Sequence, residues 1–284
     1  AGMLAVAPQS GLAQESPEGP NTGDVSLSAG IDFSTHYFFR GALQEDQGLI
    51  AQPWGEIGLN LYPGEGNFKD FGVNFGIWNS IHDEETGAQT DADGPDSLYE
   101  TDLYVGFSAT LFENFSAGVS YIAYTSPNGA FSTVQELDLT LGYDDTALWE
   151  QGGIEGFSLQ PSATLAFELD NALLGSEGAY LGLGISPSFT VVESQDYPVT
   201  LTVPVTVGLG LDDYYVDASG SNDEFGFVDV GLDFATPLSF MPGRLGDWEL
   251  GAGVHFLALG DTNEDLNNGD DFEAVGTLSL SMSY

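Results

Sequence analysis

The stretch DFEAVGTLSLSMSY (residues 271–284) alternates between apolar and polar side chains along its whole length. One side carries the apolar and aromatic positions, which are Phe272, Ala274, Gly276, Leu278, Leu280, Met282 and Tyr284. The other side is mainly polar and carries Glu273, Val275, Thr277, Ser279, Ser281 and Ser283. A period of two is that of a β-strand with one apolar and one polar face. The stretch is also long enough to cross a membrane, since a transmembrane strand needs about 9–11 residues.

The same alternation recurs from Val25 onward. It predicts eleven further strands, near residues 25–40, 49–62, 69–81, 98–111, 114–124, 133–143, 154–168, 179–191, 198–211, 224–236 and 247–258. Most of these runs reach ten residues, whereas strands of soluble proteins average about five or six. We therefore expect an all-β fold, in which residues 25–284 form a single up-and-down antiparallel β-barrel of the transmembrane type with about twelve strands. The alternative is a soluble β-sandwich, which would bury its apolar faces between two sheets.

The connections between the expected strands differ in length and charge. Three long, acidic connections, 82–97, 212–223 and 261–271, would lie on the side opposite the termini. Short ones such as 112–114 and 192–197 would lie on the side of the termini. Long outer loops opposite short periplasmic turns are the layout of outer-membrane barrels. The connections 144–153 and 237–246 fit this layout less well, because they are long for periplasmic turns.

The charge balance is extreme, with 3 Lys and Arg against 44 Asp and Glu, which gives a formal net charge of −41. Binding of nucleic acid is excluded, because so few cations could not neutralise phosphates. The acidity indicates a halophilic, saline habitat in which salt screens the charges, or divalent cations that bridge carboxylates. The chain has no cysteine, so disulfides, thiolate metal sites and thiol catalysis are excluded as well.

Residues 1–24 form an extended N-terminal tail or linker ahead of the expected barrel. Residues 1–14 are uncharged and rich in small apolar side chains, and they are either the remnant of a secretory signal peptide or a retained tail. A retained tail would need a binding partner, and it could add to a neighbouring copy as a donor strand or plug. The apolar residues that would make this contact are Met3, Leu4, Val6 and Leu12.

Two stretches resemble known outer-membrane proteins. The last strand, which closes on Tyr284, resembles the C-terminal strand of bacterial outer-membrane β-barrels. The stretch from Tyr37 to Gln44, YFFRGALQ, is similar to the Y-x-F-R-G-x-x-Q signature of an uncharacterised family of proteobacterial outer-membrane proteins. That resemblance implies a barrel secreted through a signal peptide to the bacterial outer membrane, or to the cell surface, and implies nothing about its cargo. The strong acidity departs from the family's pattern.

Alternation would turn one face of every strand toward the barrel lumen. The charged residues expected there are Asp32, Arg40, Glu56, Glu100, Asp102, Glu136, Asp138, Glu168, Asp229, Asp233, Glu249 and Glu273. Carboxylates around a water-filled lumen favour cations over anions. Arg40, with Asp32 and Glu56 expected nearby, is either a selectivity contact or a salt-bridge hub that stabilises the wall. A salt-bridge hub is the interpretation we favour from the sequence.

Metal and catalytic sites have weaker support. Two acidic loops offer oxygen ligands for Ca²⁺, namely Asp91, Asp93 and Asp96 in one and Asp261, Asn263 and Asp265 in the other. Neither has EF-hand spacing, because Leu266 and Phe272 stand where glycine and glutamate would be needed. The three histidines, His36, His82 and His255, lie in no metal motif, and no serine stands out as a nucleophile, so we do not expect an enzyme.

Two functions remain. The first is a porin-like passive channel with an acidic, cation-preferring lumen, whose outer face contacts outer-membrane lipid. The second is a structural subunit of a surface layer or extracellular filament, a homo-oligomer in which the N-terminal tail binds neighbouring copies and Ca²⁺ bridges acidic loops. We place the channel first, because it rests on the alternation that runs through the whole chain.

Overall fold

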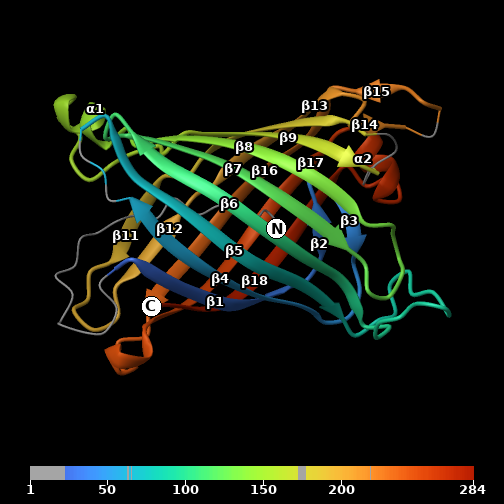
Figure 1. The fold of residues 1–284 in the computed structure, drawn as a ribbon, viewed down its shortest axis with the longest axis horizontal. Helices are drawn as coiled ribbons and strands as arrows, with labels where there is room; N and C mark the ends of the chain where they lie inside the picture. The colour runs from blue at the N-terminus through green and yellow to red at the C-terminus, as the bar shows by residue number, and fades with distance from the viewer. Residues whose placement is uncertain (1–22, 63, 65, 172–176, 218) are drawn as a thin grey trace.

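The computed structural model describes residues 23–284, except 63, 65, 172–176 and 218. The chain folds into a closed antiparallel β-barrel (Figure 1). The wall strands are β1 (Val25–Ser34), β4 (Ile50–Tyr62), β5 (Phe68–His82), β6 (Leu98–Leu111), β7 (Phe115–Thr125), β8 (Val134–Tyr143), β9 (Ser162–Asp170), β10 (Ala179–Ile185), β11 (Ser188–Val192), β12 (Val199–Thr202), β13 (Val205–Asp212), β16 (Phe225–Pro237), β17 (Asp247–Leu259) and β18 (Phe272–Ser283). None of the helices in the described part of the chain is long and apolar enough to cross a membrane.

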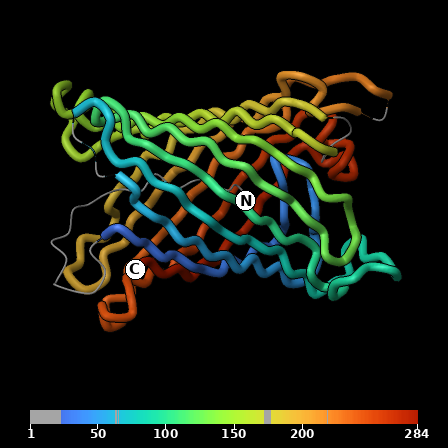
Figure 2. The backbone as a smooth tube through the Cα atoms, in the orientation of Figure 1, coloured from blue at the N-terminus to red at the C-terminus, as the bar shows by residue number. Residues whose placement is uncertain are grey.

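Twelve antiparallel strands make up the wall within the described residues, as the sequence predicts. The sheet contains fourteen segments, but β10 continues into β11 and β12 into β13, so that each pair acts as one wall strand. The wall closes where β1 pairs with β18, with Ile31 opposite Leu280 and Phe33 opposite Leu278. The tube in Figure 2 shows the strands tilted in the same sense around the axis, as closure of a barrel requires.

The apolar side of the wall faces outward. Leu278 is 48% exposed, and Ile57, Phe75 and Leu103 are exposed on other strands. Val275, which shares the opposite face of β18 with Glu273, is fully buried inside. The soluble-sandwich alternative is therefore wrong, because its apolar strand faces would be covered by a second sheet.

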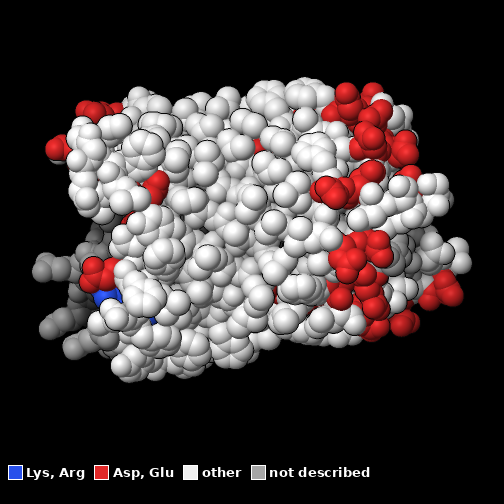
Figure 3. Space-filling model, turned by 90° about the horizontal axis from the view of Figure 1, so that it is seen from above, with Lys and Arg blue, Asp and Glu red and all other residues white. Residues whose placement is uncertain are grey.

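The two ends of the barrel differ in charge. The connections after β5, β13 and β17 lie at the end opposite the C-terminus, and they carry the short elements β14 (Tyr215–Val216), β15 (Asn222–Asp223) and α2 (Asp261–Leu266). On the face drawn in Figure 3, most Asp and Glu side chains lie at that end, a few lie at the opposite end, and the middle is almost uncharged. The other end carries α1 (Thr146–Gln151), η1 (Gly243–Leu245) and the β11–β12 hairpin.

The expected strand over residues 25–40 is wrong in its second half. β1 ends at Ser34, and the chain then folds into the lumen as a hairpin of β2 (Tyr37–Phe39) and β3 (Ala42–Glu45). In a wall strand that continued to residue 40, Tyr37 and Phe39 would lie on the outer face with Leu27, but both are buried inside the barrel. The reason is that three consecutive aromatic residues break the period of two, so both faces of this segment need apolar cover, which a wall strand could not provide.

We expect opposite outcomes for charges placed at two adjacent positions of β18. Leu278→Arg puts a guanidinium on the apolar belt and should destabilise the barrel in lipid by about 2–4 kcal/mol. Ser279→Arg puts the same group on the inner face and should cost much less. Urea unfolding in lipid vesicles measures both, and equal destabilisation would contradict the orientation of this strand.

Candidate functional site

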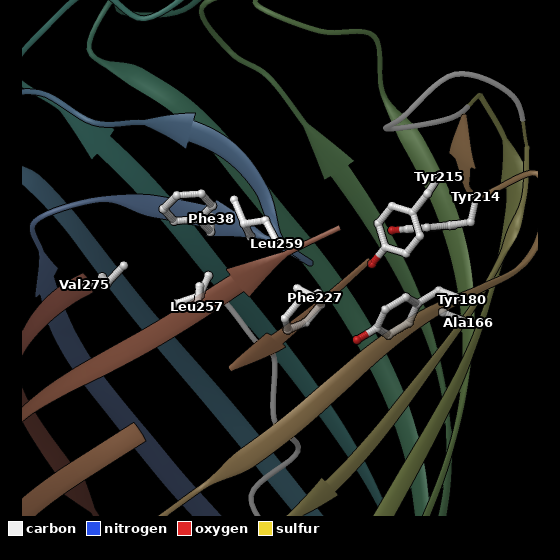
Figure 4. Close-up of a cluster of buried hydrophobic side chains, with 9 residues drawn as sticks. All are labelled: Phe38, Ala166, Tyr180, Tyr214, Tyr215, Phe227, Leu257, Leu259 and Val275. Atoms are coloured by element: carbon white, nitrogen blue, oxygen red, sulfur yellow. The ribbon is translucent and has the colours of Figure 1, made fainter. Parts of the chain in front are cut away.

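The β2–β3 hairpin lies across the lumen between two buried clusters. On one side Phe38 packs with residues of β9, β10, β16, β17 and β18 and with Tyr214 and Tyr215 (Figure 4). On the other side Tyr37 and Phe39 pack with residues of β4 to β8, including Trp78 and Ile122. Because the hairpin contacts opposite walls, it narrows the lumen at the acidic end of the barrel.

Arg40 stands at the tip of this hairpin. Its backbone has φ +48 and that of the next residue, Gly41, has φ +86, the two left-handed positions of a tight hairpin turn. The buried guanidinium makes a bidentate pair with Glu136 of β8, with N–O distances of 2.6 and 2.7 Å. Asp138 lies 3.8 Å away. The structure thus places Arg40 in a salt-bridge hub, with partners from β8 rather than the Asp32 and Glu56 that the sequence suggested.

Aromatic groups complete the surroundings of this ion pair. Tyr124 donates its hydroxyl to Glu136 at 2.8 Å, and Arg40 donates to the Tyr214 hydroxyl at 3.0 Å. The rings of Phe39, Tyr180 and Tyr214 lie 5.0, 4.3 and 5.6 Å from the guanidinium carbon. Burial lowers the pKa of Arg40, but the Glu136 carboxylate outweighs this and holds the pKa above its ordinary value. The tip of the hairpin therefore carries a permanent positive charge.

More carboxylates than cations lie at the level of the hairpin. Glu100 and Asp102 of β6 are each 3% exposed, and Tyr37 donates its hydroxyl to Glu100 at 2.8 Å. One oxygen of Asp102 and one of Asp138 have no hydrogen-bond partner among the described atoms. Glu136 and Asp138 thus lie beside the arginine, and Glu100 and Asp102 are two further buried acidic side chains near the hairpin.

The signature residues of the Y-x-F-R-G-x-x-Q stretch all lie in the β2–β3 hairpin. Besides Tyr37 and Arg40, Gln44 accepts a hydrogen bond from the Tyr99 hydroxyl at 2.6 Å. Gly41 leaves no room for a Cβ atom, which would collide with the side chain of Asn263 in α2. In this chain the stretch therefore builds a lumen hairpin and its anchors, rather than a wall strand.

A serine–histidine pair that the sequence analysis missed fixes the base of the hairpin. Ser80 lies 2.8 Å from one nitrogen of His82, and Thr86 lies 2.9 Å from the other and donates to Glu45. The sequence signal that could have revealed this pair is the two-residue spacing of Ser80 and His82 on β5, which puts both side chains on the inner face. Ser80 and His82 are completely buried, and Tyr99 stacks on the histidine ring at 4.7 Å. In this arrangement a substrate cannot reach the hydroxyl, so we interpret the network as an anchor.

The other residues expected in the lumen are spread along the wall. His255 lies between two aspartates, with its ring nitrogens 2.9 Å from Asp229 and 3.2 Å from Asp233. Glu56 accepts hydrogen bonds from Asn74 and Tyr104. The remaining four are half-buried Asp32 on β1, buried Glu168 on β9, exposed Glu249 near the start of β17 and half-buried Glu273 on β18. They form a dispersed acidic lining and not a single ring.

The proposed calcium loops take different forms. Asp91, Asp93 and Asp96 are exposed on the β5–β6 connection. Asp261, Asn263 and Asp265 lie on α2, where the buried Asn263 amide donates to the carbonyl oxygens of Gly226 and Arg40. Within the described ranges, no group of three His, Cys, Asp or Glu side chains is arranged to hold a metal ion. The assembly residues Met3, Leu4, Val6 and Leu12 lie outside the described residues.

No family model matches the sequence, and no curated protein matches it. Among solved structures, the β domain of the Bordetella autotransporter BrkA is similar over 92% of this chain and 98% of its own, with 12% identity and a TM-score of 0.43. An outer membrane channel from Pseudomonas putida F1 is similar over 92% and 94%, with 12% identity and a TM-score of 0.45. The NanC porin is similar over 92% and 98%, with 11% identity and a TM-score of 0.41. The likeness concerns the barrel architecture and nothing finer.

Removing the arginine should destabilise the fold through the carboxylate it leaves behind. Arg40→Met strands the buried Glu136 without a partner, and we expect a loss of about 3–5 kcal/mol in the free energy of unfolding. The control is Lys69→Met, which breaks the exposed pair with Glu113 and should cost about 0–1 kcal/mol.

Chemical unfolding of detergent-solubilised protein measures these losses. The double variant Arg40→Met/Glu136→Gln should recover part of the loss, because the buried charge is then gone. Additive effects of the two substitutions would show that the pair is not the source of the stability.

Proposed function

We propose that this chain is a bacterial outer-membrane barrel that acts as a porin-like passive channel and prefers cations. The observation that carries the proposal is the orientation of the wall, with an apolar belt outside and polar, acidic side chains inside. A closed barrel satisfies all backbone hydrogen bonds within the wall, so that its strands can stand in hydrocarbon. The acidic end, with its long connections, is then the outer end, and the end near the C-terminus faces the periplasm.

The charge of the lumen supports a preference for cations. Among the described residues that face the lumen, acidic side chains recur on β1, β4, β6, β8, β9, β16, β17 and β18, whereas Arg40 is neutralised by Glu136. A permeating cation would therefore meet carboxylates along the wall on both sides of the hairpin. The same carboxylates would repel an anion and raise its energy in the lumen.

The hairpin sets the narrowest level of the proposed pathway. It is held by the Arg40–Glu136 pair at its tip and by the Glu45–Thr86 hydrogen bond at its base. Solutes that pass must do so beside the hairpin or after it moves. A small passive flux of ions and small neutral solutes is what this arrangement supports best.

Planar-bilayer recordings in a salt gradient test the ion preference. We expect the unaltered protein to give a reversal potential whose sign corresponds to a preference for cations. The reversal potential should be smaller in Asp233→Asn, because this carboxylate is 38% exposed in the lumen. The matched control Asp93→Asn, on an outer loop, should leave the reversal potential nearly unchanged. Anion selectivity, or a barrel that does not conduct, would contradict the proposed function.

The hairpin should limit conductance through its tip. Arg40→Met removes the contact with Glu136, so we expect a larger unitary conductance and more frequent transitions between levels. Lys69→Met, near the start of β5 and far from the hairpin, should conduct like the unaltered protein. Identical single-channel records for the two variants would show that the hairpin does not limit the pathway.

A further inference from the structure

Two aromatic side chains on the inner face of the wall lie over glycines of the neighbouring strand. Trp54 of β4 pairs with Gly30 of β1, and a Cβ atom at Gly30 would lie only 2.7 Å from the indole atoms Cε2 and Cζ2. Tyr104 of β6 pairs with Gly76 of β5 and covers it in the same way. Both rings are half-buried, so each has one face on the wall and the other toward the lumen.

The carboxylate of Glu56 lies between these two rings. Glu56 follows Trp54 by two positions on the inner face of β4, and it pairs with the glycine that Tyr104 covers. The Tyr104 hydroxyl and the Asn74 amide both donate to its Oε2, at 3.0 and 2.7 Å. Within the described residues, no lysine or arginine forms an ion pair with Glu56. Its charge is therefore held in place by neutral donors, and Oε1 remains able to attract a cation.

The polar groups of both rings are used within the protein. The indole N–H of Trp54 donates to the carboxylate of Asp32 on β1, and the hydroxyl of Tyr104 donates to Glu56. These bonds fix the orientation of the rings. What the rings offer to the lumen is their faces, which carry the negative end of the aromatic quadrupole.

A positively charged group with an apolar surface suits this combination best. Ring faces attract cations, and the indole of tryptophan does so most strongly. A metal ion would need several oxygen ligands, whereas Glu56 is one carboxylate. A quaternary ammonium group has no N–H that needs an acceptor, and aromatic faces are the surfaces that recognise it in proteins.

These residues lie directly beside the narrow level of the lumen. Trp54 and Tyr104 pack against the buried cluster that includes Tyr37 and Phe39 of the hairpin. β6 runs from the acidic end toward the C-terminal end, so Tyr104 lies just beyond Glu100, the hydrogen-bond partner of Tyr37 (Figure 1). A solute bound here would occupy the level next to the hairpin.

We propose that Trp54, Glu56 and Tyr104 form a lumen subsite for organic cations that carry a quaternary ammonium group. The inference rests on the proposed function, because it names a class of solute for the cation-preferring channel. The two ring faces contact the methyl groups of the cation, and Glu56 supplies the opposite charge. Flux of such solutes is then saturable, since each one has to leave the subsite before the next can bind.

Calorimetric titration of the detergent-solubilised, full-length protein with choline tests the subsite. The comparison ligand is the neutral analogue in which carbon replaces the nitrogen of choline, and ionic strength is kept constant. We expect saturable binding of choline that is at least about tenfold tighter than binding of the neutral analogue. Equal affinities, or no saturable binding of choline, would overturn the proposal. Binding of glucose without binding of choline would assign the rings to a sugar and overturn it too.

Substitutions separate the ring from the charge. Trp54→Leu removes the ring and Glu56→Gln removes the charge while keeping an acceptor for Asn74 and Tyr104, and each should weaken choline binding at least about fivefold. Trp54→Phe keeps a ring and should bind more tightly than Trp54→Leu. If Trp54→Leu does not fold, the isosteric Glu56→Gln decides.

The matched control is Glu273→Gln, which removes a half-buried carboxylate of β18 at the acidic end of the lumen. It should leave the affinity for choline nearly unchanged. An equal loss in Glu273→Gln and Glu56→Gln would show that the general acidity of the lumen attracts choline, and the subsite would be refuted.

Binding is measured without ion flow, so the two proposals can fail separately. A cation-selective barrel that does not bind choline would overturn the subsite and leave the channel. A barrel that binds choline as expected but does not conduct would support the subsite and contradict the channel.

Discussion

The constraint on which the rest of the structure depends is the closure of a sheet whose apolar face points outward. Pairing of β1 with both β4 and β18 leaves no edge at the seam, and the register sets Ile31 opposite Leu280. A shift by one residue would turn the serines of β18 outward and its leucines into the lumen. Because the outer face of the wall is apolar, the charged side chains of the wall strands point into the lumen or lie at the ends of the barrel.

That constraint explains the hairpin and its charge. The aromatic run from Tyr37 to Phe39 cannot alternate, so it finds apolar cover only between the two walls of the lumen. Its turn carries Arg40 into a space lined by carboxylates, where a bidentate partner offsets the cost of burying the guanidinium. In the proposed channel, the further acidic side chains near this pair would favour cations. A structural interaction and the proposed ion preference thus share one origin.

The same constraint makes the β11 edge the exception of the fold. Within the described residues, β11 pairs with β12 on one side, and on the other side the N–H groups of Leu159 and Gln160 bond the carboxylate of Asp145. Because these two N–H groups donate to Asp145, they do not donate to a neighbouring wall strand.

The sequence by itself determined the barrel, because a period of two repeated over long runs is a local property of each strand. It also determined the outward face of β18 and the inward placement of Glu100, Asp102, Glu136 and Asp138. The tertiary structure decided that β1 stops at Ser34 and that Arg40 pairs across the lumen with Glu136, 96 positions away. It also decided that Ser80, His82 and Glu45 meet. These contacts join strands that are distant in the chain, and their partners depend on register and on barrel diameter, which no local pattern encodes.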